Sequence, residues 1–159
     1  MHPEARAWIA ANACRALTVI EIGGRNVNGT VRDLFPGSHY TAIDRVPGSG
    51  VDVVADGATW KPPKQVDVVV CCEVLEHTPT AEQIVANARQ MLKPGGLLLL
   101  TAATDGRAPH SATDGGPLRD GEFYRNVSRE MLAGWLAKYA RHQIEVDRDR
   151  GDIYAAAWR

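Results

Sequence analysis

The sequence has little of what stabilises disulfide-rich or zinc-binding scaffolds. Only three of its 159 residues are cysteine, and two of these, Cys71 and Cys72, are neighbours. Neighbouring side chains on a strand point to opposite faces, so these two thiols cannot readily pair with each other. No Cys-x-x-Cys or Cys–His spacing indicates a structural zinc site. Free thiols in apolar segments are typical of a reducing compartment, and we therefore expect a cytoplasmic protein.

Long apolar runs and a strong net charge are also missing. The longest apolar runs, such as residues 68–72, are far too short to span a bilayer. The first sixteen residues include Glu4 and Arg6 and lack a long apolar stretch, so they do not resemble a signal peptide. The formal net charge is −1, which gives no overall attraction to membranes or to nucleic acid. We expect no membrane partner, and nucleic acid is only a secondary candidate.

Helical and extended patterns alternate along the chain. The predicted helices cover residues 4–16, 30–35, 80–92 and 128–140, the last with Ser128 as its N-cap. The predicted strands cover residues 17–22, 39–43, 51–55, 66–72, 97–102, 143–146 and 153–158. Apolar strands that alternate with helices are typical of a parallel sheet covered on both faces. We therefore expect a single α/β domain over residues 1–159.

Glycines and acids stand where the predicted strands end. In chain order they are Gly23-Gly24, Asp44, Asp56-Gly57 and Glu73. Ligands of open parallel sheets bind beyond the carboxyl ends of the strands. The glycines permit a close approach of the backbone to a ligand, and Asp44 can accept both hydroxyls of a ribose. Asp56 can accept from an adenine amino group, with an ordinary Asp-Gly turn as the competing interpretation.

Five segments, in their order and spacing, resemble the class I S-adenosylmethionine-dependent methyltransferases. They are VIEIGGRNVNG, YTAID, DVVADGATW, DVVVCCEVLEH and MLKPGGLLLLT. The resemblance covers residues 17 to about 103, and its most specific parts are EVLEH and LKPGG. It implies a three-layer αβα Rossmann-like sandwich whose mostly parallel seven-strand sheet has the order 3-2-1-4-5-7-6, with strand 7 antiparallel. It also implies a methyltransferase that binds S-adenosyl-L-methionine.

The resemblance implies roles for the residues of these motifs. Glu21 and Gly23 contact the methionine end of the cofactor, Asp44 holds the ribose and Asp56 holds the adenine. The full expected cofactor-binding set is Glu21, Gly23, Gly24, Arg25, Asn28, Asp44, Arg45, Asp56, Gly57 and Glu73. The usual first motif has a glycine at every second place, whereas here Arg25 and Val27 stand at two of these places. We expect Arg25 to clamp a carboxylate instead, either that of the cofactor or that of Glu21.

The EVLEH segment supports two mechanisms. Glu73, Glu76 and His77 have the spacing i, i+3 and i+4, which places them on one face of a helical turn. With His110 as a fourth ligand they could hold Mg²⁺ or Mn²⁺, as the similar segments of ubiquinone-pathway O-methyltransferases and small-RNA 3′-end methyltransferases can. The favoured interpretation has no metal. His77 is then the general base, Glu73 lines the cofactor and Glu76 faces solvent.

A long polar segment, residues 104–127, interrupts the alternation of helices and strands. Segments of this length are usually functional, and we interpret this one as a lid over the substrate. It supplies two further catalytic candidates, His110 and Tyr124. Its polar composition favours methyl transfer to an oxygen of a small hydroxylated molecule or sugar, with a nucleic-acid end as a second possibility. The rivals are a non-catalytic cofactor-binding scaffold and an NAD-dependent dehydrogenase, whose Gly-x-Gly-x-x-Gly register this sequence lacks. The oligomeric state is open.

Overall fold

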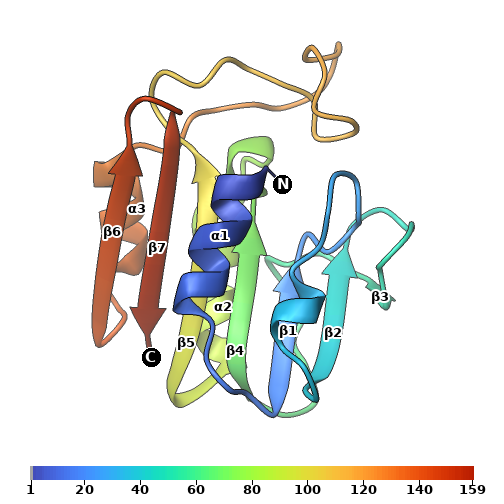
Figure 1. Cartoon of the computed structure of the whole chain (residues 1–159), viewed down its shortest axis with the longest axis vertical. Helices are drawn as coiled ribbons and strands as arrows, with labels where there is room; N and C mark the ends of the chain where they lie inside the picture. The colour runs from blue at the N-terminus through green and yellow to red at the C-terminus, as the bar shows by residue number, and fades with distance from the viewer. Residues whose placement is uncertain (1) are drawn as a thin grey trace.

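The computed structural model describes residues 2–159, which contain one sheet of the order β3-β2-β1-β4-β5-β7-β6 (Figure 1). Its strands are β1 (Thr18–Ile22), β2 (His39–Asp44), β3 (Val53–Val54), β4 (Val66–Cys72), β5 (Leu92–Ala103), β6 (Arg141–Asp147) and β7 (Asp152–Trp158). The first five strands pair in parallel, whereas β7 is antiparallel to both β5 and β6. This confirms the predicted fold class, strand order and antiparallel seventh strand.

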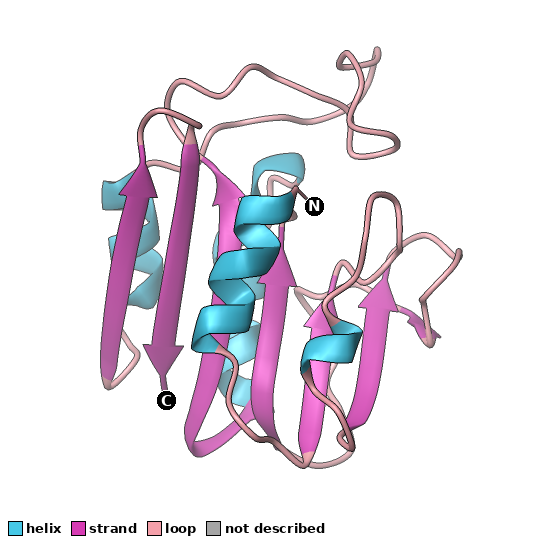
Figure 2. Ribbon diagram, viewed as in Figure 1, coloured by secondary structure: helices cyan, strands magenta, loops and turns pink. Residues whose placement is uncertain are grey.

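Helices cover both faces of the sheet and make a three-layer arrangement (Figure 2). Helix α1 (Pro3–Asn12) and the short 3₁₀ turn η1 (Arg32–Leu34) lie on one face, and α2 (Ala81–Met91) and α3 (Arg129–Leu136) lie on the other. Alternate side chains of β4 pack into the two cores on either side of the sheet, because successive residues of a strand point to opposite faces. Val68 and Val70 pack with Ile9 of α1, whereas Val69 and Cys71 pack in the core that contains α2.

Helix α2 matches its predicted range, 80–92, to within one residue at each end, whereas the other three predicted helices are clearly shorter than expected. Helix α1 stops at Asn12 because Ala13 turns to an extended conformation with ψ 138°. The segment predicted as a helix over residues 30–35 forms only the three-residue turn η1, since it is too short to offset the cost of helix nucleation. Helix α3 begins at the predicted N-cap Ser128, whose hydroxyl accepts from the amide of Met131, but it ends at Leu136.

Strand β5 is longer than the predicted strand 97–102 and includes the Lys-Pro-Gly-Gly segment. Strand β5 begins at Leu92, which pairs with Val66, and the next pair joins Leu97 to Val68. Five steps along β5 therefore face two steps along β4, so residues 93–96 form an irregularity in the pairing. The third strand is also reduced, to Val53–Val54.

The carboxyl ends of the parallel strands share one edge of the sheet, and residues 104–127, the lid loop, cross above that edge (Figure 2). The lid loop contains no helix or strand, as its composition predicts. Within residues 2–159 no helix is long and apolar enough to cross a membrane.

Candidate active site

A cavity of about 920 Å³ lies at the carboxyl ends of the strands, with the lid loop forming part of its wall. Its volume is in the range of small-molecule and cofactor sites. The predicted cofactor residues that line it are Glu21, Gly23, Arg25, Asn28, Asp44, Arg45, Asp56, Gly57 and Glu73, and the lid loop contributes Arg107 to Ser111 among others. Residues from four separate motifs therefore meet at one site.

The turn after β1 requires both of its glycines. Gly23 has φ 78°, and a Cβ at this position would lie 2.1 Å from Cγ2 of Val74. Its amide donates to the carbonyl of Ile43 at 2.8 Å, which ties the turn to β2. Gly24 packs against Ala42 of β2. A Cβ at position 24 would lie 2.5 Å from the Cβ of Ala42, so no side chain fits there. The backbone can therefore approach a ligand closely at Gly23.

Glu21 and Arg25 do not pair with each other. Glu21 is buried, and this burial raises the pKa of its carboxyl to about 7. The guanidinium of Arg25 donates instead to the carbonyl of Ala112 in the lid loop, at 3.3 Å. The expectation that Arg25 pairs with the Glu21 carboxylate is therefore wrong, because Arg25 extends toward the lid loop. Its other expected partner, a cofactor carboxylate, stays a prediction.

Two aspartates shape the far end of the cavity. The half-buried Asp44 ends β2, where its carboxylate accepts from the amides of Val46 at 2.9 Å and Arg25 at 3.3 Å. These bonds fix the carboxylate at the cavity wall. Asp56 accepts from the amide of Ala58 at 2.8 Å, so it closes a turn and also lines the cavity. The two interpretations of Asp56 are thus compatible.

Glu73 follows β4 in a conformation that is rare for residues other than glycine, with φ 55°. Its amide donates to the carbonyl of Thr101 at 2.9 Å, and the Thr101 hydroxyl donates back to Oε1 at 2.7 Å. The other oxygen, Oε2, lies 3.4 Å from Nε2 of His2. Burial alone would raise the pKa of Glu73, but the nearby imidazole of His2 and the hydrogen bond from Thr101 hold it below its usual value. Glu73 is therefore an ionised group at the cavity wall.

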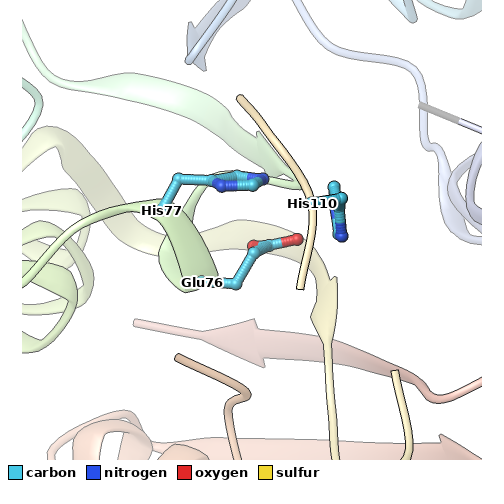
Figure 3. Close-up of side chains that lie close together, drawn as sticks. All are labelled: Glu76, His77 and His110. Atoms are coloured by element: carbon cyan, nitrogen blue, oxygen red, sulfur yellow. The ribbon is translucent and has the colours of Figure 1, made fainter. Parts of the chain in front are cut away.

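Glu76, His77 and His110 bring one potential ligand atom each to within 4.8 Å of one another (Figure 3). Glu76 and His77 lie on the 3₁₀ turn η2 (Leu75–His77), and His110 comes from the lid loop. Glu73 is not part of this group and lies with His2 and Asp152. The expected four-residue metal set is wrong in this respect, because the left-handed backbone at Glu73 breaks the helical spacing that would align it with Glu76 and His77.

Glu76 is fully buried, so the expectation that it faces solvent is wrong. One oxygen, Oε1, accepts from the amide of Ala103 at 3.1 Å, and the other, Oε2, has no hydrogen-bond partner within the described residues. Burial, together with the charge of Glu73, raises the pKa of Glu76 to about 8. The neighbouring acids therefore differ at neutral pH: Glu73 is ionised and Glu76 holds a proton.

Three rings surround this buried acid. His77, His110 and Tyr124 contact one another edge to face, with centroids 4.9 to 5.5 Å apart. Burial, with a further contribution from His110, lowers the pKa of His77 to about 4, so this imidazole is neutral at physiological pH. Nδ1 of His110 lies 3.1 Å from the carbonyl of Ala108. Because a carbonyl can only accept, Nδ1 carries the proton in the neutral form of this ring, and Nε2 is then the acceptor.

The structure adds three residues that the motifs did not indicate. His2 and Arg107 line the cavity, and Asp152 joins them: its Oδ1 accepts from Arg107 at 2.8 Å and lies 3.3 Å from Nε2 of His2. His2 precedes α1 and Asp152 begins β7, so they are far apart in the chain. A lone histidine and a lone aspartate give no sequence signal, because only the fold brings them together.

Comparison with known proteins gives the family. A family model described as "Methyltransferase domain" matches residues 5–140. The ubiquinone biosynthesis O-methyltransferase of Paraburkholderia xenovorans is 32% identical over 115 residues, which are 60% of this chain and 49% of that protein. The same enzyme of Pseudomonas entomophila is 42% identical over 53 residues, 30% of this chain and 23% of that protein. The chain thus spans about half, or less, of the length of these curated relatives.

Solved structures share the fold at low sequence identity. The Burkholderia thailandensis 1,6-didemethyltoxoflavin-N1-methyltransferase, solved with 1,6-didemethyltoxoflavin and S-adenosylhomocysteine, has a TM-score of 0.70 at 19% identity and covers 99% of this chain and 77% of its own. The N-methyltransferase NodS of Bradyrhizobium japonicum, in complex with S-adenosylhomocysteine, has a TM-score of 0.65 at 19% identity, over 98% and 84% of the two chains. Given the family match, the strand order and the motifs at one cavity, this chain belongs to the methyltransferase-domain family and is a class I S-adenosylmethionine-dependent methyltransferase domain.

Proposed function

We propose that this domain transfers a methyl group from S-adenosyl-L-methionine to an oxygen of a small, polar, hydroxylated molecule such as a sugar. The observation that carries the proposal is the convergence of Glu21, Gly23, Asp44, Asp56 and Glu73 on one cavity whose opposite wall is the lid loop. One side thus offers groups suited to a nucleoside with an amino-acid tail, and the other side offers groups suited to an acceptor.

The residues present fit the cofactor. Asp44 is fixed by two amides and its carboxylate keeps further lone pairs for the ribose hydroxyls. Gly57 is buried next to Asp56. It has no room for a side chain, because a Cβ there would lie 2.5 Å from Cγ2 of Ile22. The backbone at Gly57 is therefore bare, and a flat base can lie against it. Glu73 and Glu21 face the end of the cavity where a cationic amino group and sulfonium would be stabilised.

The acceptor would lie between η2 and the lid loop, beside His77 and His110. The reactive methyl group is carried on an activated sulfonium, so holding the acceptor oxygen in line with it supplies much of the rate. Because the pKa of His77 is lowered to about 4, this side chain accepts a hydrogen bond and orients a hydroxyl but holds a proton only briefly. Nε2 of His110 is a second acceptor for the same proton. Tyr124 supports both rings.

The chemistry of the lid loop supports a small polar acceptor. Its cavity-lining residues include the charged Arg107 and the polar His110 and Ser111. The toxoflavin N1-methyltransferase that shares the fold was solved with a small molecule and S-adenosylhomocysteine together, and the curated relatives are O-methyltransferases. The lid composition and these relatives together support an oxygen of a small polar molecule as the acceptor.

A metal-assisted version of the same reaction is the second candidate. The unpaired, fully buried Oε2 of Glu76, with nitrogens of His77 and His110 nearby, is a donor set that Mn²⁺ or Mg²⁺ can use. Such an ion would polarise the acceptor hydroxyls and favour their ionisation. Glu76 would then bind as a carboxylate, and both imidazoles would bind as neutral ligands. We favour the metal-free version, in which Glu76 stays protonated.

The proposal is tested with S-adenosylmethionine labelled in its methyl group. The protein is incubated with a panel of sugars and phenolic and aliphatic alcohols, with and without EDTA, and S-adenosylhomocysteine and labelled products are measured. A small-molecule product that carries the label in a new methyl ether supports the proposal. Label found only at RNA or DNA ends would show that the acceptor is a nucleic-acid end and not a small molecule. Cofactor binding without any methyl transfer, in extracts as well as with the panel, would favour the non-catalytic scaffold.

A further inference from the structure

We propose that His2, which no motif singles out, is a positioning residue that holds the Glu73 carboxylate at the cavity wall. The inference rests on the proposed function, because it assigns His2 to the place where S-adenosylmethionine would bind. Nε2 of His2 lies 3.4 Å from Oε2 of Glu73 and 3.3 Å from Oδ1 of Asp152. Nε2 of the imidazole thus lies between two carboxylates at different strand ends, Nδ1 lies 3.3 Å from Oε2 of Glu4, and the ring lines the cavity itself.

The position of His2 is fixed by the helix that follows it. Ala5 and Ile9 anchor α1, since both are fully buried. Trp8 stacks on Tyr154 of β7 with ring centroids 5.5 Å apart. Figure 1 shows that the first turn of α1 lies at the edge of the sheet where β4 and β5 end. The packing of α1 therefore fixes His2, the residue before this helix, at the cavity.

Glu73 needs such support from two sides. A left-handed backbone at a residue other than glycine costs roughly 1–3 kcal/mol and persists only where the surroundings enforce it. Thr101 holds the backbone amide of Glu73 and Oε1 of its carboxylate, which leaves Oε2 to His2. Asp152 is an acid next to this carboxylate, and His2 and Arg107 compensate the pair of negative charges. Without His2, Glu73 would lose one of its two side-chain anchors and would face Asp152 with less compensation.

The test measures the affinity of S-adenosylhomocysteine, so it does not depend on knowing the acceptor. Calorimetry compares the parent with His2→Ala, His2→Gln and the control His142→Ala, which changes an exposed histidine on β6. We expect His2→Ala to weaken binding about tenfold, as loss of an opposite charge 3.4 Å from the Glu73 carboxylate would. His2→Gln can still donate to Oε2, so it should recover most of the loss, and His142→Ala should bind like the parent.

A double-mutant cycle separates positioning from a general structural effect. Because His2 is proposed to act through Glu73, His2→Ala should have no further effect on affinity in a Glu73→Gln background. A purely structural loss would instead add to that of Glu73→Gln. Full additivity, or equal affinity of His2→Ala and the parent, would overturn the inference while the proposed function stands. If His2→Ala unfolds, His2→Ser, which also removes the imidazole from Glu73, is taken through the same cycle. A folded parent that does not bind S-adenosylhomocysteine would overturn the proposed function, and the inference with it.

Discussion

Replacing Glu76 by glutamine tests the electrostatics at the centre of the site. The carboxyl is fully buried, and its pKa is raised from an ordinary 4.5 to about 8. Between these two values the folded protein retains a proton that the unfolded chain has released. The free energy of unfolding therefore falls as the pH rises through this window, and the favourable contribution of neutral Glu76 is fully present only below pH 4.5.

The size of the effect follows from the width of the window. One unit of pKa shift corresponds to about 1.4 kcal/mol, so the shift to about 8 sets an upper limit of about 5 kcal/mol. Relaxation of the protein around the charged form reduces this, and we expect a loss of about 2 kcal/mol between pH 5 and pH 8 in the parent. Glutamine is neutral at every pH and can still accept from the amide of Ala103, so Glu76→Gln should lack this decline.

The assay is urea unfolding of both proteins at several pH values from 5 to 8, with EDTA present so that no divalent ion binds Glu76. Glu82→Gln, which changes an exposed acid of α2, is the matched control and should follow the parent. Parallel pH profiles of the parent and Glu76→Gln would refute the reasoning, because they would mean that Glu76 is ionised in the folded protein over the whole range.

Two further predictions concern the lid loop and the metal. Residues 104–127 should exchange amide hydrogens more slowly when S-adenosylhomocysteine is bound, and Arg25→Ala, which removes the bond to the carbonyl of Ala112, should diminish this protection. Exchange that is slow without ligand and unchanged by it would contradict a closing lid. In the metal-free mechanism EDTA leaves turnover unchanged, and His77→Ala lowers it without rescue by added Mn²⁺. Loss of turnover in EDTA with recovery in Mn²⁺ would establish the metal-assisted version instead.

The cofactor side of the site could be predicted because it depends on strand ends. A parallel sheet brings the carboxyl ends of its strands to one edge whatever the details of the loops, so Gly23, Asp44, Asp56 and Glu73 had to lie close together. The positions of these residues depend only on strand order and strand ends, and the apolar segments of the sequence indicate where the strands end. The two-residue strand β3 was enough to place Asp56 correctly.

The acceptor side could not be predicted to the same depth because it depends on single backbone angles and on tertiary contacts. Helical spacing placed Glu73 with Glu76 and His77, but φ 55° at Glu73 sends the two acids to different clusters. Glu76 is also held to the lid loop, because the Arg125 amide donates to the Glu76 carbonyl at 2.8 Å, and a sequence pattern does not indicate such a contact. His2 and Asp152 meet only because β7 inserts beside β5 in the sheet.

The most direct measurement is the binding of S-adenosylmethionine to the parent, to Asp44→Ala and to the control Asp149→Ala by calorimetry. Asp149 is exposed in the turn between β6 and β7, so its loss should not change the affinity. Losing the charged acceptor of the ribose hydroxyls should weaken binding by roughly 2–3 kcal/mol. The account predicts one site per chain in the parent and this loss in Asp44→Ala. Equal affinities of the parent and Asp44→Ala, or no binding to the folded parent, would contradict it.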